Sequence, residues 1–287
     1  LARWAELLTG LSARRSWPTW QAQHFFNQGP AGVSAQDLLR AEKPLVLFVD
    51  TFNGYFESDN ARAAFRVLSA AGYSIHLAAK AGRSSGAGGP HLCCGRTFLS
   101  QGLVDQARKQ AGELINALLP FAQRGIPIVG LEPSCLLTLR DEALVMGLGE
   151  AAQTVGAEAV LLEEFLAREA KAGRLLGLST KLRPAQQPIL VHGHCHQKAF
   201  GLMPDVLEVI RLIPGAEPEL IDSSCCGMAG SFGYEAAHER VSMDMAELSL
   251  LPALRARPEA LWVADGTSCR HQIRQASARP AIHVAQL

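Results

Sequence analysis

Two short motifs of this chain join adjacent cysteines to a glycine. Residues 220–233 (L-I-D-S-S-C-C-G-M-A-G-S-F-G) contain one Cys-Cys-Gly, and residues 91–98 (H-L-C-C-G-R-T-F) contain the other. Vicinal thiols followed by glycine, occurring twice, are hard to explain by packing, although a buried free cysteine can behave as a small apolar residue. Thiolates bind zinc and iron–sulfur clusters and also exchange disulfides, so these are the chemistries to consider.

Short apolar runs precede the cysteines and are typical of buried parallel strands. The runs that we expect to form strands are residues 45–50, 73–77, 126–130, 189–194, 220–222 and 261–265. The expected helices are residues 58–71, 103–124, 158–171, 204–213 and 235–254, the last with Val241, Met245 and Leu248 facing inward. Strands that alternate with helices predict a parallel sheet with helices on both faces.

The same pattern occurs twice along the chain. Pro44 matches Pro188, Cys93 matches Cys225, and Cys135 matches Cys269, whereas the glycine-rich loop at residues 80–90 has no counterpart in the second half. We therefore predict an α/β fold of two tandem Rossmann-like lobes with parallel sheets, related by internal duplication. The expected segments are a helical, aromatic lead-in (1–43), a first lobe (44–150), a connecting helix and linker (151–187) and a second lobe (188–287).

Four cysteines of the second half follow the three expected strands. Cys195 follows the first strand, Cys225 and Cys226 follow the second, and Cys269 follows the third. Ligands of parallel sheets gather at the carboxyl ends of the strands, so the four thiols should converge. Cys226 and Cys269 should also lie beside helix N-termini, which favour thiolates. Four such thiolates suit a [4Fe–4S] cluster or a zinc ion.

The first half offers a weaker site. Cys93, Cys94 and Cys135 match three of the four cysteines, but Thr51 stands where the second half has Cys195. Three thiolates could bind a cluster with a fourth ligand from elsewhere, or they could be a relic of the duplication.

Three histidines alternate around Cys195. If the strand continues, His192, His194 and His196 share one face and could bind zinc or copper. A histidine near a cluster more often donates a hydrogen bond to sulfur, which tunes the reduction potential. We favour this second role for His194 and His196.

Composition excludes several classes of function. The 287 residues contain 27 basic and 27 acidic side chains, which suggests no nucleic-acid or anionic-membrane partner. No apolar run approaches the ~18–20 residues of a membrane span. The first residue is Leu1 and no signal peptide is evident, so we expect a piece of a longer protein. Seven cysteines in a chain of this size suggest cytoplasmic thiols or metal ligands.

The motifs resemble the cysteine-rich "CCG" domain. It occurs in one of the subunits of heterodisulfide reductases, in the iron–sulfur subunit of glycolate oxidase and in related dehydrogenases. Four stretches are most similar to the C-terminal iron–sulfur part of FAD-linked D-lactate or 2-hydroxy-acid dehydrogenases. They are L-E-P-S-C-L-L-T-L-R-D-E (131–142), H-G-H-C-H-Q-K-A (192–199), S-S-C-C-G-M-A-G-S-F-G-Y (223–234) and A-D-G-T-S-C-R-H-Q-I (264–273).

The chain departs from this family at the end of a motif in each half. Members with a non-cubane cluster end each motif in C-x-x-C, but Thr138 and Gln272 stand where the last cysteine would be. This argues against a five-cysteine site in either half and leaves a four-cysteine site possible in the second.

The resemblance implies an iron–sulfur electron-transfer module with a flavin domain or subunit and a ferredoxin-like domain as partners. FAD would be bound only by such a partner, so this chain alone should not oxidise a substrate. The implied location is cytoplasmic, with peripheral contact to the inner face of the membrane possible through a partner. The alternative is a non-enzymatic docking module held by zinc or by metal-free thiols, and a third possibility is thiol–disulfide chemistry.

Overall fold

Seven parallel strands form two sheets in the computed structural model, which describes residues 2–79 and 91–287. The chain divides into two compact units. The N-unit contains Trp20–Leu182 and Gln286, and the C-unit contains Leu1–Thr19, Arg183–Ala285 and Leu287. These divisions differ from the sequence-based segments, because the lead-in contributes to both units. The expected loop at 80–90 lies outside the described residues.

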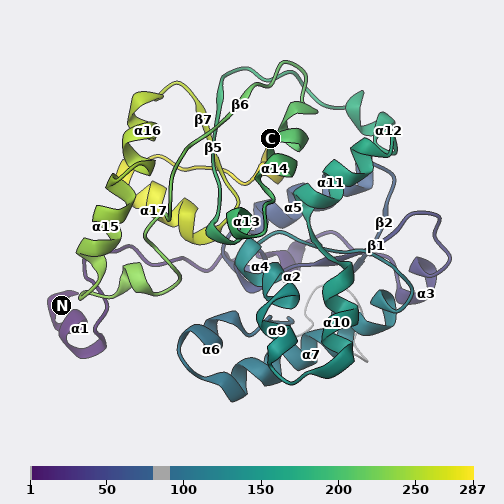
Figure 1. Cartoon of the computed structure of the whole chain (residues 1–287), viewed down its shortest axis with the longest axis horizontal. Coiled ribbons are helices and arrows are strands. Elements are labelled where there is room, and N and C mark those ends of the chain that lie inside the picture. The colour runs from purple at the N-terminus through teal and green to yellow at the C-terminus, as the bar shows by residue number, and fades with distance from the viewer. Residues whose placement is uncertain (1, 80–90) are drawn as a thin grey trace. The chain divides into compact units, whose positions relative to one another are not determined.

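The N-unit sheet has the strand order β2-β1-β3-β4. Its neighbouring strands β1 and β2 are labelled in Figure 1. Its strands are β1 (Pro44–Phe48), β2 (Ser74–Leu77), β3 (Ile128–Gly130) and β4 (Ala159–Leu161). All pairs are parallel, and Val46 of the central strand lies opposite Ile128. Four of the five residues of β1 and all of β3 are buried, so both faces of the sheet are covered, as in other parallel sheets.

Helices connect the N-unit strands. They are α2 (Phe25–Gln28), α3 (Ala35–Leu38), α4 (Thr51–Tyr55), α5 (Ser58–Ala70), α6 (Arg96–Ser100), α7 (Val104–Ala122), α8 (Pro133–Leu137), α9 (Glu142–Val145), α10 (Gly149–Glu158), α11 (Leu162–Lys171) and α12 (Leu176–Ser179), with a 3-10 turn at Thr138–Arg140. The long helix α7 buries Ala107, Ala111, Leu114 and Leu118, which lie on one stripe of the helix.

One N-unit prediction was wrong. Residues 158–171 were expected to form a single helix, but Ala159–Leu161 form the fourth strand and the helix begins at Leu162. A short apolar run fits a buried strand and a helix equally well, and here pairing with β3 decides the outcome.

The C-unit sheet repeats the topology with the order β6-β5-β7. Its strands are β5 (Ile189–His192), β6 (Pro218–Leu220) and β7 (Leu261–Ala264). Beyond β7, Ile282 forms a parallel bridge with Val263, at the place that β4 takes in the N-unit. The two parallel sheets of the same order confirm the α/β fold with two Rossmann-like lobes.

The C-unit helices surround this smaller sheet. They are α1 (Ala2–Thr9), α13 (Cys195–Ala199), α14 (Met203–Arg211), α15 (Glu239–Glu247), α16 (Leu250–Ala256) and α17 (Thr267–Ser277), with a 3-10 turn at Phe232–Tyr234. The expected helix at 235–254 is therefore two helices.

The predicted inward face of that helix was wrong at two of its three residues, and the third, Met245, is half-buried. Val241 and Leu248 are exposed, whereas Ser242, Ala246 and Leu250 are buried. The stripe was misassigned because a polar residue, Ser242, occupies the inward position and hides the apolar period.

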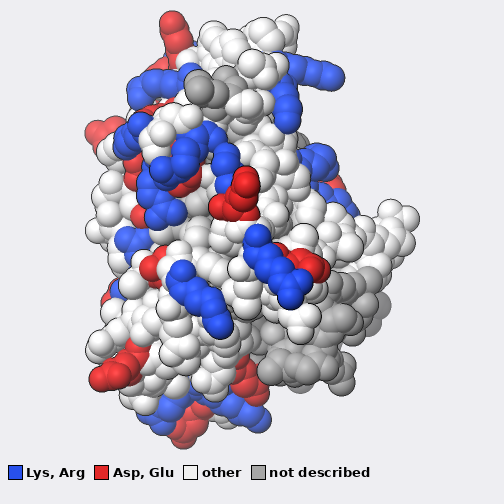
Figure 2. Space-filling view, turned by 90° about the vertical axis from the view of Figure 1, so that its right-hand side faces the viewer, with Lys and Arg blue, Asp and Glu red and all other residues white. Residues whose placement is uncertain are grey.

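Charged side chains of both signs are mixed on the face drawn in Figure 2. Several surface pairs are local, such as Arg62 with Asp59 and Arg240 with Asp244, which lie one helical turn apart. This mixture agrees with the equal numbers of basic and acidic residues.

Candidate metal centre

The four cysteines of the C-unit lie at the carboxyl ends of its three strands. Cys195 begins α13 directly after β5, Cys225 and Cys226 follow β6, and Cys269 lies in the first turn of α17 after β7. Because β6, β5 and β7 are neighbours and parallel, these ends share one edge of the sheet. We call the four residues the C-unit centre.

The sulfur atoms of the C-unit centre form a continuous chain of contacts. Cys195 hydrogen-bonds with Cys225, Cys225 with Cys226, and Cys226 with Cys269. The hydrogen bonds from Cys195 and Cys226 lower the pKa of Cys225 to about 2, and the hydrogen bond from Cys226 lowers the pKa of Cys269. The structure thus brings the four predicted residues together, while their role as ligands stays a prediction.

His192 is the histidine that reaches the sulfur atoms. It is the last residue of β5, it is 2% exposed, and its ligand nitrogen and the sulfurs of Cys226 and Cys269 all lie within 4.8 Å of one another. Nδ1 contacts Ser223 Oγ at 2.9 Å, whereas the buried Nε2 has no nitrogen or oxygen partner among the described residues. A buried imidazole nitrogen that faces thiols instead of nitrogen or oxygen groups is what a metal site would leave in its metal-free form.

His194 and His196 take different places. The strand ends at His192, so the three histidines do not share a strand face, and His194 instead caps α13 by accepting the His196 N–H at 3.2 Å on Nδ1. Burial lowers the pKa of His194, which therefore keeps a neutral ring with its proton on Nε2. The His196 ring lies 5.1 Å from the His194 ring. Hydrogen bonding of these two residues to sulfur stays a prediction.

The glycine of each Cys-Cys-Gly is required by the same geometry. Gly227 has a φ of +87°, and a Cβ there would lie 2.1 Å from the Ser242 carbonyl oxygen. Gly95 has a φ of +82°, and a Cβ would lie 2.4 Å from the Ala107 carbonyl oxygen. In both turns the glycine N–H donates to the first cysteine sulfur, at 3.3 Å in the C-unit and 3.4 Å in the N-unit.

The chain after the two turns differs. In the N-unit, α6 begins immediately after Gly95. In the C-unit, Gly227 leads into a loop in which Ala229 has a φ of +41°, a strained value for a residue with a side chain. Cys226 therefore lacks the expected helix N-terminus, whereas Cys269 has one.

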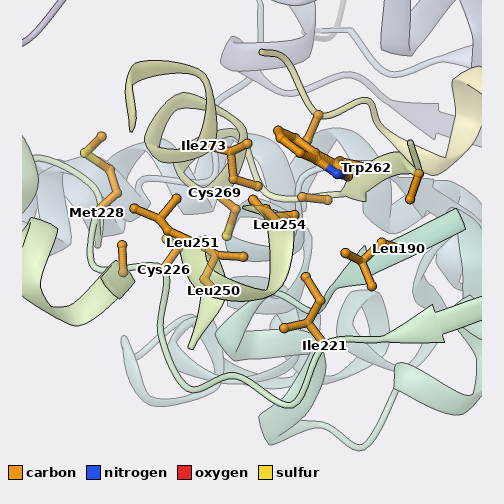
Figure 3. Packing of buried hydrophobic residues seen from close by; sticks show 14 of the residues in the cluster. Leu190, Ile221, Cys226, Met228, Leu250, Leu251, Leu254, Trp262, Cys269 and Ile273 are labelled. Carbon is orange, nitrogen blue, oxygen red and sulfur yellow. The ribbon is translucent and has the colours of Figure 1, made fainter. Parts of the chain in front are cut away.

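The inner side of the C-unit centre is apolar. Cys226 and Cys269 are 2% and 1% exposed and pack in one cluster with Leu250, Leu251 and Ile273 (Figure 3). Cys195 and Cys225 are only half-buried. The centre thus has a dry side and a side open to solvent.

The N-unit centre consists of Cys93, Cys94 and Cys135. Cys94 hydrogen-bonds with both Cys93 and Cys135, and the Thr51 hydroxyl, in the place of a fourth thiol, contacts Cys93. The hydrogen bond from Cys94 lowers the pKa of Cys135, but burial and the nearby charges of Asp50 and Glu132 outweigh it and raise the value to about 11. Carboxylates beside thiols oppose the thiolate form that metals need.

The donor set of the C-unit centre fits a cluster or a zinc ion. Four sulfurs in contact satisfy the ligand number of a [4Fe–4S] cluster or of tetrahedral zinc, and the histidine nitrogen adds a donor that both accept. His192 is the first histidine of the His-x-His-x-His pattern. It is the only one of the three that lies within the first strand, and this position could have distinguished it from His194 and His196.

No helix among the described residues is both long and apolar enough to cross a membrane.

The chain is similar to dehydrogenase proteins. It is 27% identical over 244 residues to one of the subunits of the anaerobic glycerol-3-phosphate dehydrogenase of Escherichia coli K12, covering 83% of this chain and 57% of that protein. It is 28% identical over 248 residues to D-2-hydroxyglutarate dehydrogenase of Pantoea ananatis, covering 86% of this chain and 22% of that protein. The chain therefore spans little more than half of one relative and about a fifth of the other.

A protein-family model matches the part of the chain that contains the C-unit centre. The matching family model is described as a cysteine-rich domain, CCG, and it covers residues 189–274. That range begins with β5 and ends within α17, so it contains all four cysteines of the C-unit centre. The resemblance predicted from the motifs is thus confirmed, because the model of the cysteine-rich CCG domain matches residues 189–274 of this chain.

Proposed function

We propose that the C-unit centre binds one iron–sulfur cluster of the [4Fe–4S] type through Cys195, Cys225, Cys226 and Cys269. The chain would then be the electron-transfer module of a flavin-dependent 2-hydroxy-acid dehydrogenase. Its electron donor would be a flavin domain or subunit, and its acceptor a later redox partner such as a ferredoxin-like domain.

One observation carries this proposal: four sulfurs from three strand ends form a continuous chain of contacts at one edge of a sheet. Cysteines that served only as apolar core residues would have no reason to meet there. The similarity to two kinds of dehydrogenase supports an oxidoreductase. The seven cysteines are all free, which is typical of a reducing compartment and supports a cytoplasmic location.

The residues around the centre suit electron transfer. When bound, the cluster supplies one-electron chemistry that protein side chains lack. The apolar inner side formed by Leu250, Leu251 and Ile273 limits water access, which influences the potential. The half-buried Cys195 and Cys225 leave an outer edge at which a redox partner can approach.

A charged side chain holds the Cys-Cys-Gly loop against α13. Lys198 Nζ donates to the Ser224 carbonyl oxygen at 2.8 Å and also to the carbonyl oxygen of Ser223. Because Lys198 lies on the helix that begins with Cys195, this contact fixes the spacing between Cys195 and the vicinal pair. It also places a positive charge beside the thiolates.

Anaerobic reconstitution with iron and sulfide, followed by EPR of the reduced protein, tests the proposal directly. We expect a cluster signal that disappears when Cys225→Ala and Cys226→Ala are combined. A protein that binds no cluster, or a signal that survives this double substitution, contradicts the proposal.

Elemental analysis separates the cluster from the zinc alternative. Protein purified without oxygen should contain iron and sulfide in comparable amounts. One zinc ion and no iron would instead identify a docking module held together by metal. Redox activity in metal-free protein that alkylation abolishes would identify thiol–disulfide chemistry.

A further inference from the structure

Arg15 is a buried arginine of the C-unit that has no charged hydrogen-bond partner among the described residues. It is 6% exposed, and its hydrogen bonds go to neutral oxygens. The acceptors are the Gly233 carbonyl oxygen at 2.7 Å, Gln272 Oε1 at 2.8 Å, Gln275 Oε1 at 2.8 Å and Ser242 Oγ at 2.9 Å. Hydrogen bonding is thus satisfied, but the charge is not neutralised by these contacts.

A buried guanidinium needs a negative charge nearby, because it stays protonated in proteins and its desolvation is costly. The acidic groups whose charge acts on Arg15 are Glu239, Tyr234 and Cys226. Glu239 already accepts hydrogen bonds from Arg14 at 2.9 Å and from Ser12. A tyrosine is neutral at ordinary pH. Glu239 therefore balances part of the charge of Arg15. Cys226, a member of the C-unit centre, is neutral in the metal-free protein, because hydrogen bonds with Cys225 and Cys269 and burial raise its pKa, and it adds a negative charge when it binds a metal as a thiolate.

The contacts of Arg15 lead to both buried cysteines. Gln272 lies one helical turn beyond Cys269 on α17, and its Nε2 donates to the Ser242 carbonyl oxygen at 2.9 Å. Gly227, the residue after Cys226, packs against the same Ser242 carbonyl group. Arg15 therefore binds the two side chains that fix the Cys226 turn and the Cys269 helix relative to each other.

The corresponding positions of the N-unit have no such acceptors. Ala107 carries the carbonyl on which Gly95 packs, so it takes the place of Ser242 but lacks a hydroxyl. Thr138 lies three residues after Cys135, in the place of Gln272, and its hydroxyl donates to the Ser134 carbonyl oxygen at 2.8 Å. The guanidinium site belongs to the unit with four cysteines.

We propose that Arg15 is the internal counter-charge of the C-unit centre. A metal centre held by four thiolates is anionic, and a fixed cation close to it favours both its assembly and its reduced, more negative state. Arg15 is thus a positioning residue that raises the reduction potential. The effect on the reduction potential rests on the proposed function, because it requires a bound iron–sulfur cluster.

The test uses the neighbouring arginine as a control. Arg15→Gln and Arg14→Gln remove the same charge, but Arg14 is 74% exposed in its side chain and pairs with Glu239. In reconstituted protein, Arg15→Gln should shift the midpoint potential to more negative values, whereas Arg14→Gln should leave it nearly unchanged. Arg15→Lys should restore most of the shift, because it keeps the charge. A merely structural role for Arg15 would move the thermal unfolding midpoint but not the potential.

A second variant and zinc binding provide two further measurements of the effect of the Arg15 charge. If Arg15→Gln does not fold, Gln272→Glu places a carboxylate against Arg15 and should lower the potential in the same direction. Zinc competition with a chromophoric chelator provides a readout without iron: Arg15→Gln should bind zinc several-fold more weakly than the wild type.

Each outcome bears on a separate claim. A bound cluster whose potential is the same in the wild type and Arg15→Gln overturns the role of Arg15 and leaves the proposed function intact. An Arg15→Lys protein that behaves like Arg15→Gln also overturns it. A wild type that binds zinc but no cluster contradicts the proposed function, and the zinc comparison then decides on Arg15. A wild type that binds neither metal overturns both.

Discussion

An imidazole caps the helix of the first cysteine in the C-unit, whereas a carboxylate caps the equivalent helix of the N-unit. His194 accepts the His196 N–H at the start of α13. Asp50 accepts the N–H groups of Phe52 and Asn53 at the start of α4. Both residues lie two positions after the last residue of the first strand, and both are buried, so the arrangement is the same and the capping group differs.

The electrostatic difference extends around the cysteines. In the C-unit, His192 lowers the pKa of Cys225 and Cys269, and Lys198 opposes the increase in the pKa of Cys195. In the N-unit, Asp50 and Glu132 raise the pKa of Cys135. Thr51, in the place of a fourth thiol, thus coincides with carboxylates that oppose the thiolate form of a neighbouring cysteine. The two units thus share the geometry of the Cys-Cys-Gly turn but differ in the charges around their cysteines.

The largest expected difference concerns one buried cysteine in each turn. Cys226 and Cys94 are both 2% exposed and follow the same turn geometry. Cys226→Ala should abolish the iron content of reconstituted protein, because it removes the sulfur that bridges Cys225 and Cys269. Cys94→Ala should leave the iron and sulfide content unchanged. Equal losses of iron in the two variants would mean that both centres bind iron, which would contradict the proposed difference between the two units.

A fourth thiol can be introduced into the N-unit. Thr51→Cys, made in a Cys226→Ala background that removes the C-unit centre, should add one equivalent of zinc to the protein, since Thr51 already contacts Cys93. Thr51→Val in the same background is the control and should add none. If Thr51→Cys gains no zinc, the carboxylates of Asp50 and Glu132 are the stronger obstacle, and adding Glu132→Gln should then allow zinc to bind.

The sequence predicted the parts of this arrangement that depend on strand order. Cys195, Cys225, Cys226 and Cys269 each follow an apolar run, and parallel strands must bring such residues to one edge. The repeat of the pattern followed from the same spacing, and the weaker N-unit centre stays a prediction that rests on aligning Thr51 with Cys195. These inferences needed only the chain direction and the position of each residue after its strand.

Other features depend on side chains that meet only after folding. Arg15 is far from the cysteines in sequence and lies in a segment expected to be a lead-in, so nothing in its neighbourhood signals burial. Ser242 was hidden because it faces inward at a position where a hydrophobic residue was expected. The split between α15 and α16 and the strand β4 were missed because short apolar runs do not distinguish between alternatives that tertiary pairing decides.

The shared turn geometry gives matched stability changes. Gly227→Ala and Gly95→Ala each force a side chain into a left-handed backbone conformation and against a carbonyl oxygen at 2.1 and 2.4 Å. Each should destabilise its own unit by at least about 2–3 kcal/mol. Hydrogen–deuterium exchange of metal-free protein should show faster exchange in the substituted unit. A large effect of one substitution and none of the other would contradict the equivalence of the two turns.

Acid should lower the stability of the N-unit through one buried carboxylate, and this effect is smaller than those above. Glu169 of the N-unit accepts Arg174 Nη2 at 2.7 Å and a hydrogen bond from the Tyr73 hydroxyl. The hydrogen bond from Arg174 is the main cause that lowers the pKa of Glu169 to about 2, despite burial. Because this pKa is lower in the folded than in the unfolded chain, the stabilisation is present above about pH 4.5 and is lost as the pH falls towards 2.

Glu169→Gln should therefore destabilise the N-unit at pH 7 by on the order of 2 kcal/mol, with the difference from the wild type shrinking towards pH 2. The difference in unfolding free energy can be measured at pH 7 and pH 3 by urea titration, with hydrogen exchange of N-unit peptides as the readout. Glu239→Gln is the matched change in the C-unit and should have a weaker effect, because its partner Arg14 is 74% exposed and the ion pair is screened by solvent. A destabilisation by Glu169→Gln that is independent of pH would mean that packing, not the ionised carboxylate, stabilises this corner of the N-unit.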